Sequence, residues 1–348
     1  MPCRSVDTEA LRQITDQVGR LDAIGPGTRV FIKPNLTFPF HRPGVTTAPD
    51  MIRAVTQVLV ERGAQVTIGE GGPSLDVFST KESFEAHGLF ELAREFGVRI
   101  ADLCEKDVVR LNFGRRAAAR NVPIPRLLLE GTDLFVSLPV VKVHAMTRVS
   151  LALKNQWGCI PIKKRFLLHS AFDEIVVGLN RLLPDPLVIC DGRWVLTDNG
   201  PMFGTVRRGA FLAVANDIGA FDLAMCRLMG VPVHSVSHLR HAQREGLAPA
   251  SLNEVDVNCD PARFRPCPFP LKRTVQNYIA LAGFQSRLLS TLGYDSALAG
   301  PLHRLLHAVK GNPLKEAMAA APDARRGRPC VATQRGGKEP SASPLSAR

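Results

Sequence analysis

The sequence predicts an α/β fold, a mostly parallel sheet with helices on both faces, followed by a C-terminal helical extension and a disordered tail. Short apolar runs alternate with amphipathic segments of roughly 10–15 residues, which is typical of right-handed βαβ units. Residues 187–190 are continuously apolar, as in a strand covered on both faces. Beyond Pro322, proline, arginine, serine and glycine prevail and leave little to bury.

An N-terminal helix is expected within residues 1–27, at positions 8–21. The α/β domain then spans residues 28–248, with strands at 29–32, 65–68, 98–103, 134–138, 187–190 and 211–215 and helices at 48–62, 81–96, 172–182 and 218–229. Thr47 is the predicted N-cap of the first of these helices, with Asp50 as its acidic partner. The helical extension covers residues 249–321, with amphipathic helices at 274–292 and 301–309, and the disordered basic tail is residues 322–348.

The composition is that of a foldable globular protein rather than a disordered one. Of 348 residues, 45% are hydrophobic, and 44 Lys and Arg against 32 Asp and Glu give a formal net charge of +12. No run approaches the ~18 consecutive apolar residues that a membrane span needs. Residues 1–13 lack the apolar segment of a secretory signal. We therefore expect a cytoplasmic protein.

The positive charge is concentrated in two segments. Residues 139–169 contain no acidic side chain and six basic ones, namely Lys142, Arg148, Lys154, Lys163, Lys164 and Arg165. The tail from residue 322 carries a net charge of +4. Because the rest of the chain is nearly neutral, the sequence favours a local anion site over a general affinity for nucleic acid.

The cysteines and histidines give little support for a metal centre. None of the eight cysteines forms a CxxC, and the closest two, Cys259 and Cys267, are separated by seven residues. We therefore expect reduced thiols, and no intrinsic iron–sulfur cluster. His234, His238 and His241 would share a helix face and are an alternative metal site, although nearby turn residues weaken the helix prediction. The GxSxG, Walker A and HExxH motifs are absent, which removes the main support for the standard hydrolase, NTPase and zincin classes.

Polar side chains follow five of the predicted strands. They are Lys33-Pro34-Asn35, Gly69-Glu70-Gly71-Gly72, Lys142-Val143-His144, Asp191-Gly192 and Asn216-Asp217. In open α/β sheets, ligands bind beyond the carboxyl ends of the strands, so convergence of these residues predicts a site there. Taken singly, the glycine-containing pairs are also explained as ordinary turns.

The candidate residues fall into three roles. The catalytic candidates are His144 as general acid or base, with Lys142, Lys154 and Asp191. The substrate-binding candidates are Lys33, Asn35, Thr47, Glu70, Gly71 and Asn155. A divalent metal is one candidate cofactor, with Asp217 and Asp222 as its ligands; Asp217 is also explained as a helix cap, and Asp222 in its apolar helix needs a partner such as one of the lysines.

For the run Lys163-Lys164-Arg165, a solvated surface is the preferred interpretation. Lys142 and Lys154 differ, because they lie among apolar residues, where an uncompensated ammonium is costly unless it binds an anion.

Several separated strings resemble the family catalogued as domain of unknown function 362. They are Val30-Phe31-Ile32-Lys33-Pro34-Asn35-Leu36, Gly44-Val45-Thr46-Thr47-Ala48-Pro49, Leu138-Pro139-Val140-Val141-Lys142-Val143-His144, Ala152-Leu153-Lys154-Asn155-Gln156-Trp157-Gly158, Asp191-Gly192, Gly200-Pro201-Met202-Phe203-Gly204 and Asn216-Asp217-Ile218-Gly219-Ala220-Phe221-Asp222. The resemblance covers residues 28–248. It implies an α/β fold and a link to redox work, since many members carry a ferredoxin-like module with CxxCxxCxxxC repeats. This chain has no such module.

Three functions are open at this point. The first is an enzyme that acts on a small phosphate- or carboxylate-bearing molecule, metal-assisted or redox-linked. The second is a non-catalytic redox partner or maturation protein that works with a separate ferredoxin-like iron–sulfur protein. The third is peripheral membrane or nucleic-acid binding through the C-terminal region, where residues 271–310 hold five basic side chains and one acidic one. Few aromatic residues and no known motif argue against nucleic acid.

Overall fold

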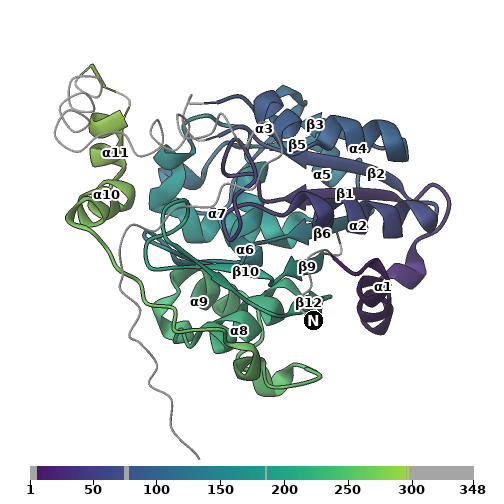
Figure 1. Cartoon of the computed structure of the whole chain (residues 1–348). Helices are drawn as coiled ribbons and strands as arrows, with labels where there is room; N and C mark the ends of the chain where they lie inside the picture. Colours follow the sequence, from purple (N-terminus) through teal and green to yellow (C-terminus); the bar gives the residue numbers. More distant parts are fainter. Residues whose placement is uncertain (1–5, 74–77, 185, 295, 298–348) are drawn as a thin grey trace, which may run out of the picture. The chain divides into compact units, whose positions relative to one another are not determined.

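The computed structural model describes residues 6–73, 78–184, 186–294 and 296–297 (Figure 1). The chain divides into two units, Met1–Ala299 and Gly300–Arg348, and the second lies outside the described residues. The predicted helix at 301–309 and the predicted disordered tail at 322–348 therefore also lie outside them.

A six-stranded sheet forms the centre of the first unit. Its order is β12-β9-β6-β1-β2-β3, with β1 (Arg29–Pro34), β2 (Gln65–Glu70), β3 (Arg99–Asp102), β6 (Leu134–Leu138), β9 (Leu187–Asp191) and β12 (Leu212–Ala215). All neighbours are parallel except β12, which runs antiparallel to β9. The predicted α/β class with a mostly parallel sheet is thus confirmed.

Two smaller sheets accompany the central one. One is the pair β4 (Val108–Leu111) and β5 (Val122–Pro125). The other has the order β11-β10-β7-β8, with β7 (Lys142–His144), β8 (Arg148–Ser150), β10 (Trp194–Thr197) and β11 (Thr205–Arg208). Neither sheet was predicted from the sequence, because strands of three or four residues are too short to show a clear alternation of apolar and polar side chains.

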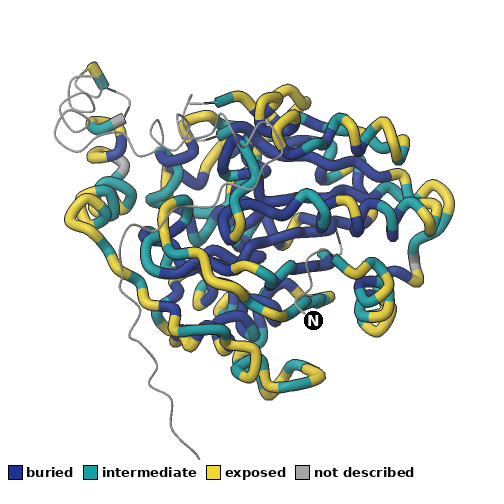
Figure 2. The backbone as a smooth tube through the Cα atoms, in the orientation of Figure 1, coloured by how far each residue is buried: buried dark blue, intermediate teal, exposed yellow. Residues whose placement is uncertain are grey.

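Helices cover both faces of the central sheet because alternate side chains of each strand point to opposite sides. Val30 and Ile32 of β1 pack in the core under α1 (Thr8–Gln17), α2 (Pro49–Glu61), α3 (Thr80–Ala86) and α4 (Leu89–Phe96). Phe31 packs in the opposite core, under α5 (Arg126–Leu129), α6 (Ala152–Asn155), α7 (Phe172–Leu182), α8 (Ile218–Met229) and α9 (Ser237–Arg244). Figure 2 shows the four inner strands of this sheet, β9, β6, β1 and β2, as mostly buried, whereas the edge strands β12 and β3 are less buried.

Short 3₁₀ segments and two C-terminal helices complete the described chain. The segments are η1 (Leu21–Ala23), η2 (Leu103–Glu105), η3 (Ala117–Ala119), η4 (Gln156–Cys159), η5 (Arg165–Ala171), η6 (Val233–Ser235), η7 (Leu252–Glu254) and η8 (Pro261–Phe264). The helices are α10 (Val275–Gln285) and α11 (Arg287–Tyr294), which contact each other and η5. The predicted single helices at 81–96 and 274–292 are each divided in two, the first at Gly88, which has a φ of 70°.

The helix ends test several predictions. Gly97 and Gly230 end α4 and α8 in the left-handed conformation, and Asp217 caps α8 through the N–H of Ala220, as predicted. The predicted N-cap role of Thr47 is wrong. Ala48 occupies that position, while the Thr47 hydroxyl is hydrogen-bonded elsewhere.

The direction of β12 overturns one further expectation. Because β12 is antiparallel to β9, with Leu212 opposite Asp191, its end lies at the edge of the sheet away from the other strand ends. Asn216 there donates to the carbonyl of Val18, just after α1. The hairpin of β10 and β11 connects β9 to β12 without a crossover helix, which allows the antiparallel direction. Asp217 therefore does not join the other candidates.

Candidate anion-binding site

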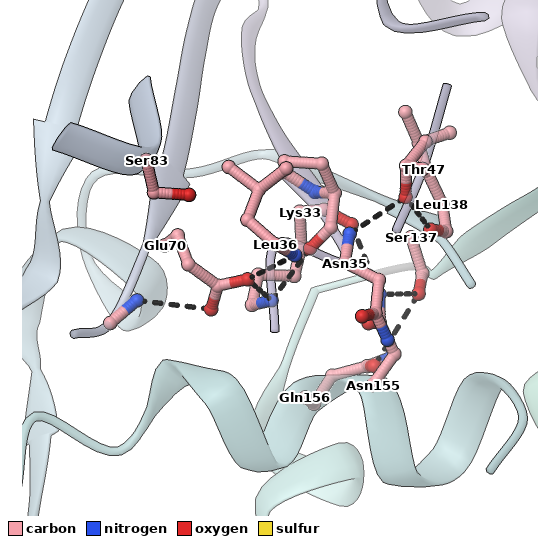
Figure 3. A network of polar contacts seen from close by, with 12 residues as sticks. Lys33, Asn35, Leu36, Thr47, Glu70, Ser83, Ser137, Leu138, Asn155 and Gln156 are labelled. Atoms are coloured by element: carbon pink, nitrogen blue, oxygen red, sulfur yellow. Dashed lines mark hydrogen bonds and ion pairs between the residues drawn. The ribbon is translucent and has the colours of Figure 1, made fainter. Parts of the chain in front are cut away.

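A buried ion pair joins the carboxyl ends of β1 and β2. The amine of Lys33 lies 2.7 Å from Oε2 of Glu70, and the two side chains are 1% and 9% exposed. The same Oε2 accepts the N–H of Leu36 at 3.1 Å, and Oε1 accepts that of Gly71 at 3.1 Å (Figure 3). The carboxylate of Glu70 is therefore fully engaged by protein donors.

Two glycines close over this ion pair. The N–H of Gly71 donates to the carbonyl of Gly158 at 3.0 Å. A Cβ at Gly71 would collide with that carbonyl oxygen, and a Cβ at Gly158 would collide with Oε1 of Glu70. Glycine is required at both positions by the close approach of the two segments.

Lys142 comes from β7 and points into the same network. Its amine donates to Oδ1 of Asn35 at 3.2 Å and to the carbonyl of Val45 at 2.7 Å. Its side chain is 1% exposed. Burial, reinforced by the charges of Lys154 and Lys33, lowers the pKa of Lys142 well below its usual range.

Thr47 and Asn155 connect the strand ends to one another. The Thr47 hydroxyl accepts the N–H of Asn35 at 2.8 Å and donates to the carbonyl of Leu138 at 2.7 Å. Nδ2 of Asn155 donates to the carbonyl of Lys33 and to the hydroxyl of Ser137, both at 3.0 Å (Figure 3). The predicted residues Lys33, Asn35, Thr47, Glu70, Gly71, Lys142 and Asn155 thus form one hydrogen-bonded network.

This network retains unused hydrogen-bonding capacity. Oδ1 of Asn155 and Nε2 of Gln156 are buried and have no hydrogen-bond partner within the described part of the chain. Buried polar atoms are normally paired, so an acceptor and a donor on consecutive residues, both without partners, indicate a place for a ligand or water.

His144 follows Lys142 by two residues on β7 and is 7% exposed. Its Nδ1 accepts the N–H groups of Met146 at 3.1 Å and Thr147 at 3.3 Å. In the neutral ring the hydrogen is therefore on Nε2, which can act as a donor. Burial, followed by the charges of Lys154 and Lys142, lowers the pKa of His144 well below its usual range.

The amine of Lys154 is 5.8 Å from the ring centroid of Phe172. It makes no hydrogen bond or ion pair with any described residue, and the side chain is partly exposed. Burial and the charge of Arg165 lower its pKa to about 8. An amine with such a pKa exchanges its proton close to neutral pH.

Aromatic and imidazole rings surround this lysine. Trp157 and Phe172 have centroids 4.8 Å apart, and His238 lies edge-on to Phe172 at 5.6 Å. His169 lies 5.2 Å from Trp157 and stacks on Phe284 of α10 at 4.4 Å. Burial lowers the pKa of both histidines to about 3, and the charge of Lys154 contributes. His169 was not among the residues predicted for the site, and its only signal in the sequence is its position at the end of the basic segment.

Arg165 is a second residue that the sequence misplaced. Lys163 and Lys164 are exposed, as expected. Arg165 is 6% exposed and donates to the carbonyls of Ile160 at 2.8 Å and Gly72 at 2.6 Å. Two carbonyl acceptors offset part of the cost of burying the guanidinium, whose Nε is buried without a hydrogen-bond partner among the described residues.

Asp191 leaves β9 at the same edge, but it is bound to Arg193 at 2.7 Å, and Arg193 also holds Asp50 at 2.7 Å. Asp191 lines a depression of about 10 Å³, room for one water molecule, together with Thr47 and Trp194. Its carboxylate is not hydrogen-bonded to any of the candidate lysines among the described residues.

The two metal candidates lie apart. Oδ1 of Asp222 on α8 accepts the N–H groups of Ala152 at 2.8 Å and Leu153 at 3.4 Å, so its partner is the start of α6 and the predicted lysine partner is wrong. Burial raises the pKa of Asp222 to about 8. Asp217 is at the opposite edge. Within the described ranges, no three His, Cys, Asp or Glu side chains are grouped so that they could hold a metal ion.

Comparison with known proteins places these motifs in context. The chain is 27% identical over 256 residues to "Thylakoid-associated protein sll1697" of Synechocystis, covering 70% of this chain and 76% of that protein. It is also similar to a crystallised protein of Thermotoga maritima, with 12% identity, a TM-score of 0.33 and 62% of this chain covered; the chain spans 56% of that protein's length. In the part of the chain that is described, no helix is long and apolar enough to cross a bilayer.

A family model also matches the chain. The model of the family described as "Domain of unknown function (DUF362)" matches residues 30–227, which contain the Lys33–Glu70 ion pair, Lys142, His144 and Lys154. The match covers more than half of the 348 residues. The chain therefore belongs to the DUF362 family.

Proposed function

We propose that the chain is an enzyme that binds a small phosphate- or carboxylate-bearing molecule beside Lys142, His144 and Lys154. The uncompensated positive charge of this region carries the proposal. Lys142 donates to neutral oxygens, Lys154 has no acceptor among the described residues, and Glu70 is already engaged by Lys33. A bound anion would offset the cost of burying these amines.

The unused groups suggest acid–base chemistry on such a molecule. The Nε2–H of His144 can donate a hydrogen bond or a proton, and the amine of Lys154, with a pKa of about 8, can accept or release one near neutral pH. Oδ1 of Asn155 and Nε2 of Gln156 would orient polar groups of the ligand. The proposal assigns no role to a metal, because Glu70 and Asp191 are paired with Lys33 and Arg193, and among the described residues no three His, Cys, Asp or Glu side chains are grouped around Asp222.

Binding measurements test the proposal directly. Isothermal titration with phosphate, pyrophosphate and citrate should show a saturable site in the wild-type protein, and this binding should weaken at least tenfold in Lys154→Met. Lys106→Met removes an exposed lysine and should bind as the wild type does. Equal weakening in both variants, or no saturable binding of any of the three anions, would contradict the proposal.

Peripheral membrane attachment is a second candidate function, favoured by one surface. Six large apolar side chains of α10 and α11 are exposed, namely Val275 (72%), Tyr278 (59%), Ile279 (65%), Leu288 (71%), Leu289 (48%) and Leu292 (44%). Residues 271–310 carry five basic side chains against one acidic one. Apolar helices with basic flanks suit the surface of an anionic bilayer, and a relative is described as thylakoid-associated.

Vesicle flotation tests this second candidate. The protein should float with vesicles that contain phosphatidylglycerol and not with purely zwitterionic ones. The double variant Ile279→Asp/Leu288→Asp should stay in solution. Val257→Asp/Phe264→Asp replaces exposed apolar residues outside these helices and should float as the wild type does. Flotation unaffected by the first pair would contradict membrane attachment through α10 and α11, as would dissociation of an oligomer by that pair without any flotation of the wild type.

A further inference from the structure

Three lysines near the strand ends differ in the partners of their side-chain amines. The ammonium of Lys33 is paired with Glu70, and that of Lys142 has two oxygen acceptors. The amine of Lys154 has neither within the described residues. Of the three, Lys154 is also the one whose side chain is partly exposed, so a small molecule can reach it.

The surroundings of Lys154 raise the fraction of its amine that is neutral near pH 7. Its amine lies over the ring of Phe172, next to Trp157 and to imidazoles that burial keeps uncharged, while Arg165 adds a nearby positive charge. A lysine in an apolar setting beside another cation is a recurrent way of producing a nucleophilic amine at neutral pH. General acid–base catalysis by Lys154 would not by itself require that its amine lack a hydrogen-bond acceptor.

We propose that Lys154 forms an imine with an aldehyde or ketone that also carries a carboxylate or phosphate group. This inference rests on the proposed anion site, since the cations around Lys142 and Arg165 would hold the charged group while the carbonyl meets Lys154.

The step balances without any oxidant or reductant. The nitrogen of Lys154 attacks the carbonyl carbon, a C–N bond forms, and the carbonyl electron pair moves to oxygen, which takes a proton from Nε2 of His144. The nitrogen then gives up two protons, one to Nε2 of His144, which regains the proton that it donated, and one to the oxygen, so that the C–O bond breaks and the oxygen leaves as water. The product is a C=N bond between substrate and Lys154, and hydrolysis by water reverses the sequence.

Reductive trapping tests the inference. The full-length protein is treated with glyoxylate and sodium cyanoborohydride at pH 7, and labelled lysines are identified by peptide mass spectrometry. Lys154 should be labelled at least about tenfold faster than Lys106, because a pKa of about 8 gives it a far larger fraction of free amine. Phosphate should slow this labelling, and neutral acetaldehyde should label Lys154 less well than glyoxylate.

Lys154→Arg distinguishes imine formation from anion binding, because arginine keeps the positive charge but cannot form an imine. It should retain phosphate binding and lose the label. Labelling that follows exposure alone, or that falls on Lys142, would overturn the inference. An absence of label at Lys154 while phosphate still binds would overturn the imine and leave the anion site standing, whereas loss of both results would overturn both proposals.

Discussion

The amine of Lys33 lies 2.7 Å from Oε2 of Glu70, although the two residues are 37 positions apart in the chain. They meet because β1 and β2 are parallel neighbours whose carboxyl ends coincide, with Ile32 paired with Ile68. The pair is buried, and the chain folds Gly71 and Gly158 tightly over it. The pair anchors the hydrogen-bonded network at the strand ends. Lys142 belongs to this network, and His144 and Lys154 are next to its members on β7 and α6.

Glu70→Gln should destabilise the protein by about 3–5 kcal/mol, because it leaves the buried ammonium of Lys33 without a counter-charge. Urea unfolding followed by circular dichroism measures this loss. Lys33→Met/Glu70→Gln should cost less than the sum of the two single variants. Additive effects would show that the two side chains do not depend on each other.

Gly71→Ala should cost about 1–3 kcal/mol, because the added Cβ would meet the carbonyl oxygen of Gly158. Gly283→Ala is the matched control: its Cβ would have nothing within 4 Å, and in the interior of α10 alanine should stabilise by about 0.5–1 kcal/mol. Thermal unfolding of both variants checks the contrast. Equal effects would refute the close approach of the two glycine segments.

Asp222 makes stability depend on pH. Its pKa in the folded protein is raised to about 8 from 3.8, so its contribution is fully present below about pH 4 and is lost as the pH rises through 8. Asp222→Asn should remove this fall, because the amide oxygen still accepts the N–H groups of α6. Asp222→Ala should lack the fall as well, and because it also loses the acceptor it should be about 1 kcal/mol less stable than Asp222→Asn at every pH, as a missing cap is. A series of melting temperatures from pH 4 to 9 measures both, and identical slopes for wild type and Asn variant would contradict this assignment.

Lys154→Met should stabilise the protein at pH 7. The pKa of Lys154 is lowered to about 8 from 10.5, so the cost of holding its charge is full below pH 8 and fades as the pH rises toward 10.5. The difference in melting temperature from the wild type should therefore shrink between pH 7 and 10. The exposed Lys106→Met should differ little at either pH. A destabilised Lys154→Met at pH 7 would mean that the lysine supports the fold rather than a ligand.

The sequence predicted correctly those features of the fold that depend on the residues of a single helix or strand. Continuous apolar strands and their spacing predicted the parallel sheet, and the residues that follow β1, β2 and β6 were placed at one edge. Positive-φ glycines such as Gly97 and Gly230 marked the helix ends. These features depend on local preference and on the common direction of parallel strands.

Features set by long-range packing could not be predicted. The direction of β12 depends on the hairpin of β10 and β11, whose strands are too short to be recognised from their pattern. Arg165 follows two exposed lysines, so the sequence predicts that it is exposed as well. Its guanidinium is instead buried and donates to the carbonyls of Ile160 and Gly72. The partner of Asp222 is a pair of backbone N–H groups, which no side-chain pattern reveals.

The location of a bound anion tests the central claim most directly. Crystals soaked in selenate, an oxyanion that can be located by anomalous scattering at the selenium edge, should show a peak within hydrogen-bonding distance of the Lys154 amine and close to His144. The same soak of Lys154→Met crystals should lack that peak. Selenate found only on exposed basic side chains, or at the same position in the variant, would contradict an anion site built around Lys142, His144 and Lys154.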